Sequence, residues 1–266
     1  MPDEVGQQQS AEPLHPTPSL FDEGFAAAAV SDGLRRVWRT AEPDLPAEIE
    51  PFSFLSVDLL DYVSRALALS PGQVLVDLAC GRGGPGLWLA RAAGASLIGV
   101  DFSLVAVEQA AARTDLFGLR DRARFIVGDL TGTGLPDATA DAAVCIDAMH
   151  FPAEPAVAAA EAWRILQPGG RLVLTNWQPR SPGDPRLPSR MRHRPWGLTL
   201  GQAGFTDIRV EARPEWHDAF TRVYQAALDA GDPTGDTALA HLQDEARRGL
   251  DTAQLLDRVV ASGTRP

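Results

Sequence analysis

Three carboxylates that directly follow short apolar runs are the residues of this sequence best suited to chemistry. Asp77 lies in the run 74–78, Asp101 ends the run 96–101, and Asp129 follows the run 124–127. Short apolar runs rich in β-branched residues predict strands. The carboxyl ends of parallel strands meet at one edge of a sheet, where ligands bind. Three carboxylates at that edge favour a ligand with cationic and hydrogen-bond-donating groups over a phosphate.

A glycine-rich turn follows the first of these strands. The segment 79–86 reads Ala-Cys-Gly-Arg-Gly-Gly-Pro-Gly and leads into the apolar run 87–90, which predicts a strand, a tight turn and a helix start. Such a turn directs free backbone N–H groups at a ligand. Gly81, Gly83 and Gly86 also satisfy the dinucleotide fingerprint, and Asp101 follows at the spacing which that fingerprint requires.

Asp77 separates these two readings of the turn. A carboxylate at the strand tip would repel a pyrophosphate by about 4 kcal/mol per charge pair at a separation of about 4 Å. The same carboxylate complements the ammonium and sulfonium groups of S-adenosylmethionine. The residues therefore favour S-adenosylmethionine over NAD, with a ligand-free turn as the remaining alternative.

The elements that must position these residues alternate regularly along the chain. Strands are expected at 74–78, 96–101, 124–127, 141–147 and 171–177, with helices between them, which predicts a doubly wound parallel sheet of the α/β class. Two further strands are expected at 206–212 and 258–263, separated by helices at 215–230 and 237–256. Helices at 21–38 and 53–69 precede the sheet; they either pack on it or cover the ligand, with Trp38, Phe52 or Phe54 near it. Residues 1–20 are polar and rich in proline, and are expected to form a disordered tail.

Composition restricts the class of partner. The chain has 266 residues, of which 45% are hydrophobic, and this is enough for one sizeable core. A net charge of −11 opposes binding to nucleic acid or to an anionic membrane, so a small-molecule partner fits better. Two cysteines are too few for a disulfide scaffold or a metal cluster, and no metal site is expected. The sequence shows neither a signal peptide nor a membrane-spanning run, and a cytoplasmic protein, possibly a homodimer, is expected.

The successive motifs resemble those of the class I S-adenosylmethionine-dependent methyltransferases, in particular the small-molecule branch that includes natural-product enzymes. The motifs are 77–83, 99–101, 128–129 and 164–170. The resemblance implies a seven-stranded Rossmann-like sheet in the order 3-2-1-4-5-7-6 with the last strand antiparallel. It also implies that Gly81 and Gly83 contact the methionine part, Asp101 the ribose and Asp129 the adenine. The full set of expected cofactor-binding residues is Asp77, Ala79, Gly81, Gly83, Asp101, Phe102, Gly128, Asp129 and Leu130. Ala79 departs from the family, which often has glycine there.

The acceptor side is expected where the fourth and fifth strands end. His150 and Asp147 are the candidate bases, since His titrates near neutral pH. An arginine-rich loop follows the fifth strand, and it is either a solvated surface loop or a gate for an anionic acceptor. The expected substrate-binding residues are Met149, Asn176, Trp177, Arg190 and Arg192. The helices between the sixth and seventh strands could form an acceptor wall or a dimer surface.

These observations predict a single methyltransferase domain over 21–266. Its parts are a helical cap at 21–70, a cofactor-binding core at 72–177 and acceptor-side elements at 178–266. The predicted function is methyl transfer from S-adenosylmethionine to an oxygen, nitrogen or carbon atom of a small molecule, expected to be a bacterial secondary metabolite. The alternatives are an NAD-dependent oxidoreductase and a protein that binds S-adenosylmethionine without transferring its methyl group.

Overall fold

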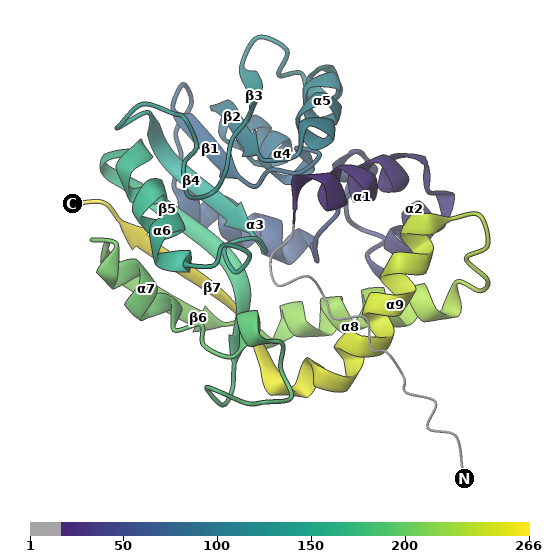
Figure 1. Ribbon diagram of the computed structural model, residues 1–266. Coiled ribbons are helices and arrows are strands. Elements are labelled where there is room, and N and C mark those ends of the chain that lie inside the picture. The colour runs from purple at the N-terminus through teal and green to yellow at the C-terminus, as the bar shows by residue number, and fades with distance from the viewer. Residues whose placement is uncertain (1–16) are drawn as a thin grey trace.

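A seven-stranded sheet organises the computed structural model, which describes residues 17–266 (Figure 1). The strand order is β3-β2-β1-β4-β5-β7-β6, as expected. β1 to β5 are parallel, and β7 runs antiparallel to both of its neighbours, β5 and β6. The bounds of the strands are β1 Val74–Leu78, β2 Ser96–Asp101, β3 Ala123–Val127, β4 Ala140–Ile146, β5 Leu166–Pro179, β6 Thr206–Ala212 and β7 Leu256–Thr264.

Side chains that alternate between the two faces of the sheet divide the core into two layers. Leu75, Leu97 and Val173 share one cluster with residues of α3, α4 and α8, whereas Val76 and Leu172 share another with residues of α6 and α7. Side chains of successive strand residues point to opposite faces, so these strands are buried on both sides. The bounds of the longer helices are α1 Pro18–Val30, α2 Asp32–Ala41, α3 Val57–Leu67, α4 Gly84–Ala93, α5 Leu104–Ala112, α6 Pro155–Ile165, α7 Trp196–Gln202, α8 Pro214–Asp229 and α9 Thr237–Thr252.

The N-terminal cap contains one more helix than expected. The predicted helix 21–38 is divided at Ser31, whose hydroxyl accepts a hydrogen bond from the Leu34 N–H and so begins α2. This is a standard N-cap, and it ends α1 because Ser31 has an extended backbone conformation. α1 starts at Pro18, inside the segment expected to be a tail; the rest of that expectation, residues 1–16, lies outside the described residues.

The expected insertion between β6 and β7 is present as the antiparallel pair α8 and α9, which Figure 1 shows below the cap. Trp216 and Val223 of α8 are buried in the sheet core, and Phe220 and Tyr224 form a third cluster with Trp177.

Asp236 joins the insertion to the cap. One of its carboxylate oxygens accepts from the Leu239 N–H and caps α9, and the other accepts from Ser31 Oγ at 2.8 Å and from the Gly33 N–H at 3.0 Å.

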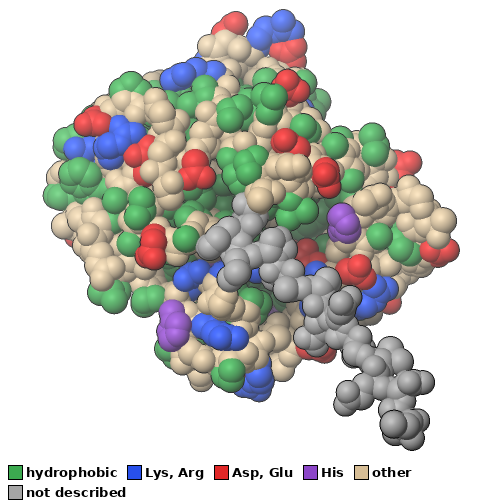
Figure 2. Space-filling model, in the orientation of Figure 1, with side chains coloured by type: hydrophobic (Ala, Val, Ile, Leu, Met, Phe, Trp, Pro, Cys, Tyr) green, Lys and Arg blue, Asp and Glu red, His purple; other side chains and the backbone are tan. Residues whose placement is uncertain are grey.

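The described surface carries both signs of charge. Figure 2 shows acidic and basic side chains interspersed over one face, with apolar side chains between them. Within residues 17–266, none of the helices combines the length and the hydropathy that crossing a bilayer requires.

Candidate cofactor and acceptor site

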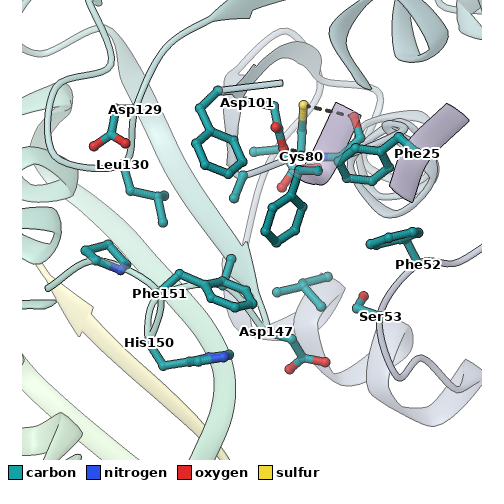
Figure 3. A pocket seen from close by; sticks show the side chains of 18 of the residues that line it. Phe25, Phe52, Ser53, Cys80, Asp101, Asp129, Leu130, Asp147, His150 and Phe151 are labelled. Carbon is teal, nitrogen blue, oxygen red and sulfur yellow. Dashed lines mark hydrogen bonds between the residues drawn. The ribbon is translucent and has the colours of Figure 1, made fainter. Parts of the chain in front are cut away.

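A cavity of about 960 Å³ lies where the carboxyl ends of the strands meet the cap. Its wall includes residues of α1, the loop 50–54, the glycine turn, the segments after β2, β3 and β4, and Glu245 of α9. Figure 3 shows Asp101 and Asp129 toward one end and Asp147 and His150 toward the other. The volume is at the upper end of the range for small-molecule pockets.

The glycine turn is held by its own hydrogen bonds. Gly81 has φ +50° and donates its N–H to Asp101 Oδ2 at 2.8 Å, and the Gly83 N–H donates to the Cys80 carbonyl at 2.9 Å. Both amides are therefore engaged within the protein, which corrects the expectation that they are free for a ligand. Gly81 lines the cavity but Gly83 does not. A Cβ on Gly83 would lie 2.9 Å from the Ala110 Cβ, so Gly83 serves helix packing.

Ala79 lies at the start of the same turn and lines the cavity. Its φ of +56° is in the left-handed region, which costs an alanine about 1 kcal/mol relative to glycine. The departure from the family pattern thus affects the backbone conformation rather than the space above the turn.

Asp77 is the most strongly perturbed carboxyl of the cavity. It is buried, and its Oδ2 has no hydrogen-bond partner among the described residues. Burial, and then the nearby charge of Asp101, raise its pKa from 3.8 to about 8. A Cβ on Gly86 would lie 2.3 Å from this oxygen, so only glycine fits there. An unpartnered buried carboxyl at a cavity wall calls for a cationic ligand group.

The residues after β2 and β3 line the same end of the cavity. Asp101 accepts from the Ser103 and Gly81 N–H groups at 2.9 and 2.8 Å, although burial raises its pKa above the usual value. Asp129 Oδ1 accepts from the Thr131 N–H and hydroxyl. The predicted cofactor residues of this region that line the cavity are Asp101, Phe102, Gly128, Asp129 and Leu130.

Aromatic side chains of the cap cover the cavity. Phe21 of α1 makes edge contacts with Phe102 and Phe151, at ring-centroid distances of 5.2 and 5.6 Å, and Phe25 lies 4.4 Å from Phe52. Of the three aromatic residues expected near the ligand, Phe52 and Phe54 line the cavity, whereas Trp38 is buried in the sheet core. Phe21, Phe25 and Phe151 were not among the residues expected near the ligand. The one signal for the first two was their spacing of one helical turn.

His150 lines the acceptor end of the cavity but does not have the pKa expected of it. Burial, reinforced by the positive charges of Arg190 and Arg194, lowers its pKa from 6.5 to about 3. The ring is therefore neutral at physiological pH. Its Nδ1 is buried without a hydrogen-bond partner in the described part of the chain.

Asp147 also lines the cavity, but it is fully engaged. Its two oxygens accept from Arg258 Nη1 at 2.5 Å and Nη2 at 3.0 Å, and Oδ1 also accepts from the Thr175 hydroxyl at 2.9 Å. The carboxylate of Asp147 is thus held by a guanidinium and a hydroxyl, and its role as a base stays a prediction. Arg258 lies 111 positions away on β7, and nothing in the local sequence signals the contact.

The expected substrate residues separate into two groups. Trp177 and Arg190 line the cavity. Met149 is buried in the core, and Asn176 is buried with its Oδ1 accepting from the Trp177 N–H. Arg192 donates to the carbonyls of the loop that carries it, at 185 and 187. Met149, Asn176 and Arg192 therefore lie outside the cavity wall, and their roles in substrate binding stay predictions.

Carboxylates at strand ends, a glycine turn and this sheet order are typical of a Rossmann-like fold with a ligand site at the carboxyl ends of its strands. Comparison with known proteins specifies the class. A family model described as a methyltransferase domain matches residues 76–174. The chain is 33% identical over 135 residues to methyltransferase GfsG of Streptomyces halstedii, and 31% identical over 117 residues to a sterol 24-C-methyltransferase of Yarrowia lipolytica. These matches cover 50% and 44% of this chain.

A solved structure matches over nearly the whole chain. The cyclase SpnF superposes with a TM-score of 0.74 at 23% identity, over 96% of this chain and 98% of that one, and so shares the fold. The matched stretches cover only 48% of GfsG and 30% of the sterol methyltransferase. Residues 76–174 thus resemble a methyltransferase domain, and the sheet order is the one that the resemblance to class I S-adenosylmethionine-dependent methyltransferases implied.

Proposed function

We propose that this protein binds S-adenosylmethionine and transfers its methyl group to a small apolar molecule. The observation that carries the proposal is Asp77, which is buried next to Asp101 in the cavity wall and whose Oδ2 has no hydrogen-bond partner among the described residues. A dinucleotide would bring a pyrophosphate to this turn, whereas S-adenosylmethionine brings an ammonium. The charges therefore favour the sulfonium cofactor.

The residues at the acidic end fit that cofactor in type and order. Asp77 would pair with the ammonium, and Asp101 would accept hydrogen bonds from the ribose hydroxyls. Asp129 would accept from the adenine amino group, with Leu130 and Phe102 against the faces of the ring. When bound, the cofactor supplies an electrophilic methyl group. The aromatic cover contributed by α1 excludes water from this end of the cavity.

The opposite end would hold the acceptor. Phe54, Phe151 and Trp177 provide apolar walls, and His150 provides a neutral ring whose Nδ1 has no hydrogen-bond partner among the described residues. The low pKa of His150 makes it a weak base, so alignment of the acceptor is the larger contribution, for which orientation can supply about 7–11 kcal/mol. We infer an acceptor with one polar group on an apolar body. A bacterial secondary metabolite meets this description, and the relative GfsG is from a Streptomyces species.

A second candidate function is binding of S-adenosylmethionine without methyl transfer. It is favoured by the similarity in fold, over nearly the full length, to a protein whose name describes a cyclase. The engagement of Asp147 by Arg258 is compatible with either function, because neither needs a free carboxylate at that position.

Titration calorimetry with S-adenosylmethionine, S-adenosylhomocysteine and NAD tests the first step. Binding of the first two and no binding of NAD is expected; tight NAD binding alone would overturn the proposal. Incubation of a small-molecule extract with S-adenosylmethionine labelled in its methyl group, followed by mass spectrometry, tests the second step. Labelled product identifies a methyltransferase, and unlabelled conversion that requires the cofactor identifies the second candidate function.

A further inference from the structure

Arg258 is a buried guanidinium that the proposed chemistry does not use. It is 1% exposed and lies on β7, directly across from Trp177 of β5. Burying a lone cation costs several kcal/mol, so such a residue persists only where its surroundings compensate the charge. The contacts of Arg258 therefore show what it holds together.

The guanidinium contacts three separate parts of the acceptor end. It pairs with both oxygens of Asp147 at the tip of β4, at 2.5 and 3.0 Å. Nη2 also donates to the Phe54 carbonyl in the cap loop at 3.2 Å, and Cζ lies 4.6 Å from the centroid of the Trp177 ring. Asp147, Phe54 and Trp177 all line the cavity, whereas Arg258 itself does not.

The pair also controls the turn that carries His150. Asp147 has φ +57°, and its N–H donates to the Thr175 carbonyl at 3.1 Å. Left-handed backbone of this kind persists where surrounding contacts hold it. His150 follows three residues later and enters the cavity from this turn. The guanidinium thus acts on the position of His150 through Asp147.

We propose that Arg258 is a positioning residue that fixes the acceptor wall, formed by Asp147, Phe54, Trp177 and the turn to His150. The proposal rests on the proposed function for the identity of the ligand at that wall. It does not involve the cofactor end, because the contacts of Arg258 lie on the other side of the cavity. Loss of the pair should therefore affect the acceptor end and leave cofactor binding unchanged.

A charge-neutral double variant separates positioning from folding. Arg258→Met alone leaves Asp147 buried without its partner, and such single variants can fail to fold. Combining Arg258→Met with Asp147→Asn removes both charges, and asparagine tolerates the left-handed φ. Glu161→Gln with Arg164→Met is the matched control, because it removes another two-contact ion pair that lies outside the cavity.

Hydrogen exchange measured by mass spectrometry reports on the stability of the acceptor wall and does not require a known acceptor. In the double variant we expect exchange of the amides at 147–151 to rise at least tenfold, with strands β1 and β2 unchanged and the control variant equal to the parent in all these segments. Affinity for S-adenosylhomocysteine should stay within twofold. With an acceptor identified as above, kcat/KM should fall about 10²-fold, the effect of a misplacement of about 1 Å.

Two results would overturn the proposal. One is unchanged exchange at 147–151 in the folded double variant, and the other is an equal rise throughout the sheet, which would make the pair a contribution to stability alone. Failure of the parent to bind S-adenosylhomocysteine would instead contradict the proposed function, and the exchange comparison would still decide the role of Arg258.

Discussion

Replacing Asp77 by asparagine tests the electrostatic argument for the cofactor most directly. The carboxyl has a pKa of about 8, so the free protein binds a proton there at pH 7. An ammonium about 4 Å from the ionised carboxylate is worth about 4 kcal/mol at an effective dielectric of about 20. Removing the proton at pH 7 costs about 1.4 kcal/mol, since the pKa lies about one unit higher. The net contribution is about 2–3 kcal/mol, so Asp77→Asn should weaken binding of S-adenosylhomocysteine about 30- to 150-fold at pH 7.

The pH dependence provides a second, independent measurement on the same variant. Below pH 8 the parent must release a proton on binding, so its affinity should fall about tenfold from pH 7 to pH 6, whereas the asparagine variant should show no such change. The stability of the free parent changes with pH in the opposite direction to its ligand affinity. The folded-state pKa is raised, so between pH 3.8 and 8 the native state binds more protons than the unfolded chain. The free parent therefore loses up to about 6 kcal/mol as pH rises through that window.

Calorimetry at pH 6, 7 and 8 and thermal unfolding at pH 5 and 8.5 measure both effects. Asp77→Asn should raise the Tm relative to the parent, and more so at pH 8.5 than at pH 5. The same variant should weaken binding of S-adenosylhomocysteine. An unchanged affinity at pH 7, together with equal pH profiles for parent and variant, would refute the pairing of Asp77 with the ammonium.

Three further predictions concern the two ends of the cavity. Asp101→Ala should weaken binding of S-adenosylhomocysteine by about 1–3 kcal/mol in calorimetry, because the ribose hydroxyls lose their acceptor. His150→Gln should lower kcat about 10²-fold with cofactor affinity intact. The kcat of the parent should not decline between pH 8 and pH 5, because the pKa of His150 is about 3. A titration midpoint near pH 6.5 in kcat that disappears in His150→Gln would contradict that pKa. Arg190→Ala should raise the acceptor KM, because Arg190 lines the cavity. Arg192→Ala should leave the acceptor KM within twofold, because the Arg192 side chain is bound to its own loop. Equal effects of both variants would show that the loop acts as a unit.

The parts of the structure that depend on local pattern were predictable from the sequence. Apolar runs predicted each strand, although β5 begins at Leu166 rather than at 171, and the family resemblance implied the sheet order. The carboxylates at strand ends do line one cavity. The division of the cap at Ser31 was missed, although the Ser31 hydroxyl caps α2 locally, because the apolar positions continue across it. Here the periodicity of one helix concealed the start of another.

Contacts between distant segments were not predictable, and they determine the surroundings of the residues expected at the acceptor end. Asp147 and His150 have residue types suited to a base. However, Asp147 is paired with Arg258, and burial lowers the pKa of His150 to about 3. Neither effect has a local sequence signal, since both depend on which strands and loops become neighbours. Arg190 and Arg192 differ for the same reason: they are two positions apart in one loop, and only one of them faces the cavity.

Asp236 has a consequence for ligands bound at the two ends of the cavity. The same carboxylate begins α9 and binds the Ser31 hydroxyl at the start of α2, so the cap and the insertion are joined through one side chain. α1 of the cap covers the cofactor end of the cavity, and α9 contributes Glu245 to its wall. A coupling of ligands at the two ends through this residue would be reciprocal. Whatever factor a bound cofactor adds to the affinity for the acceptor, a bound acceptor must add equally to the affinity for the cofactor.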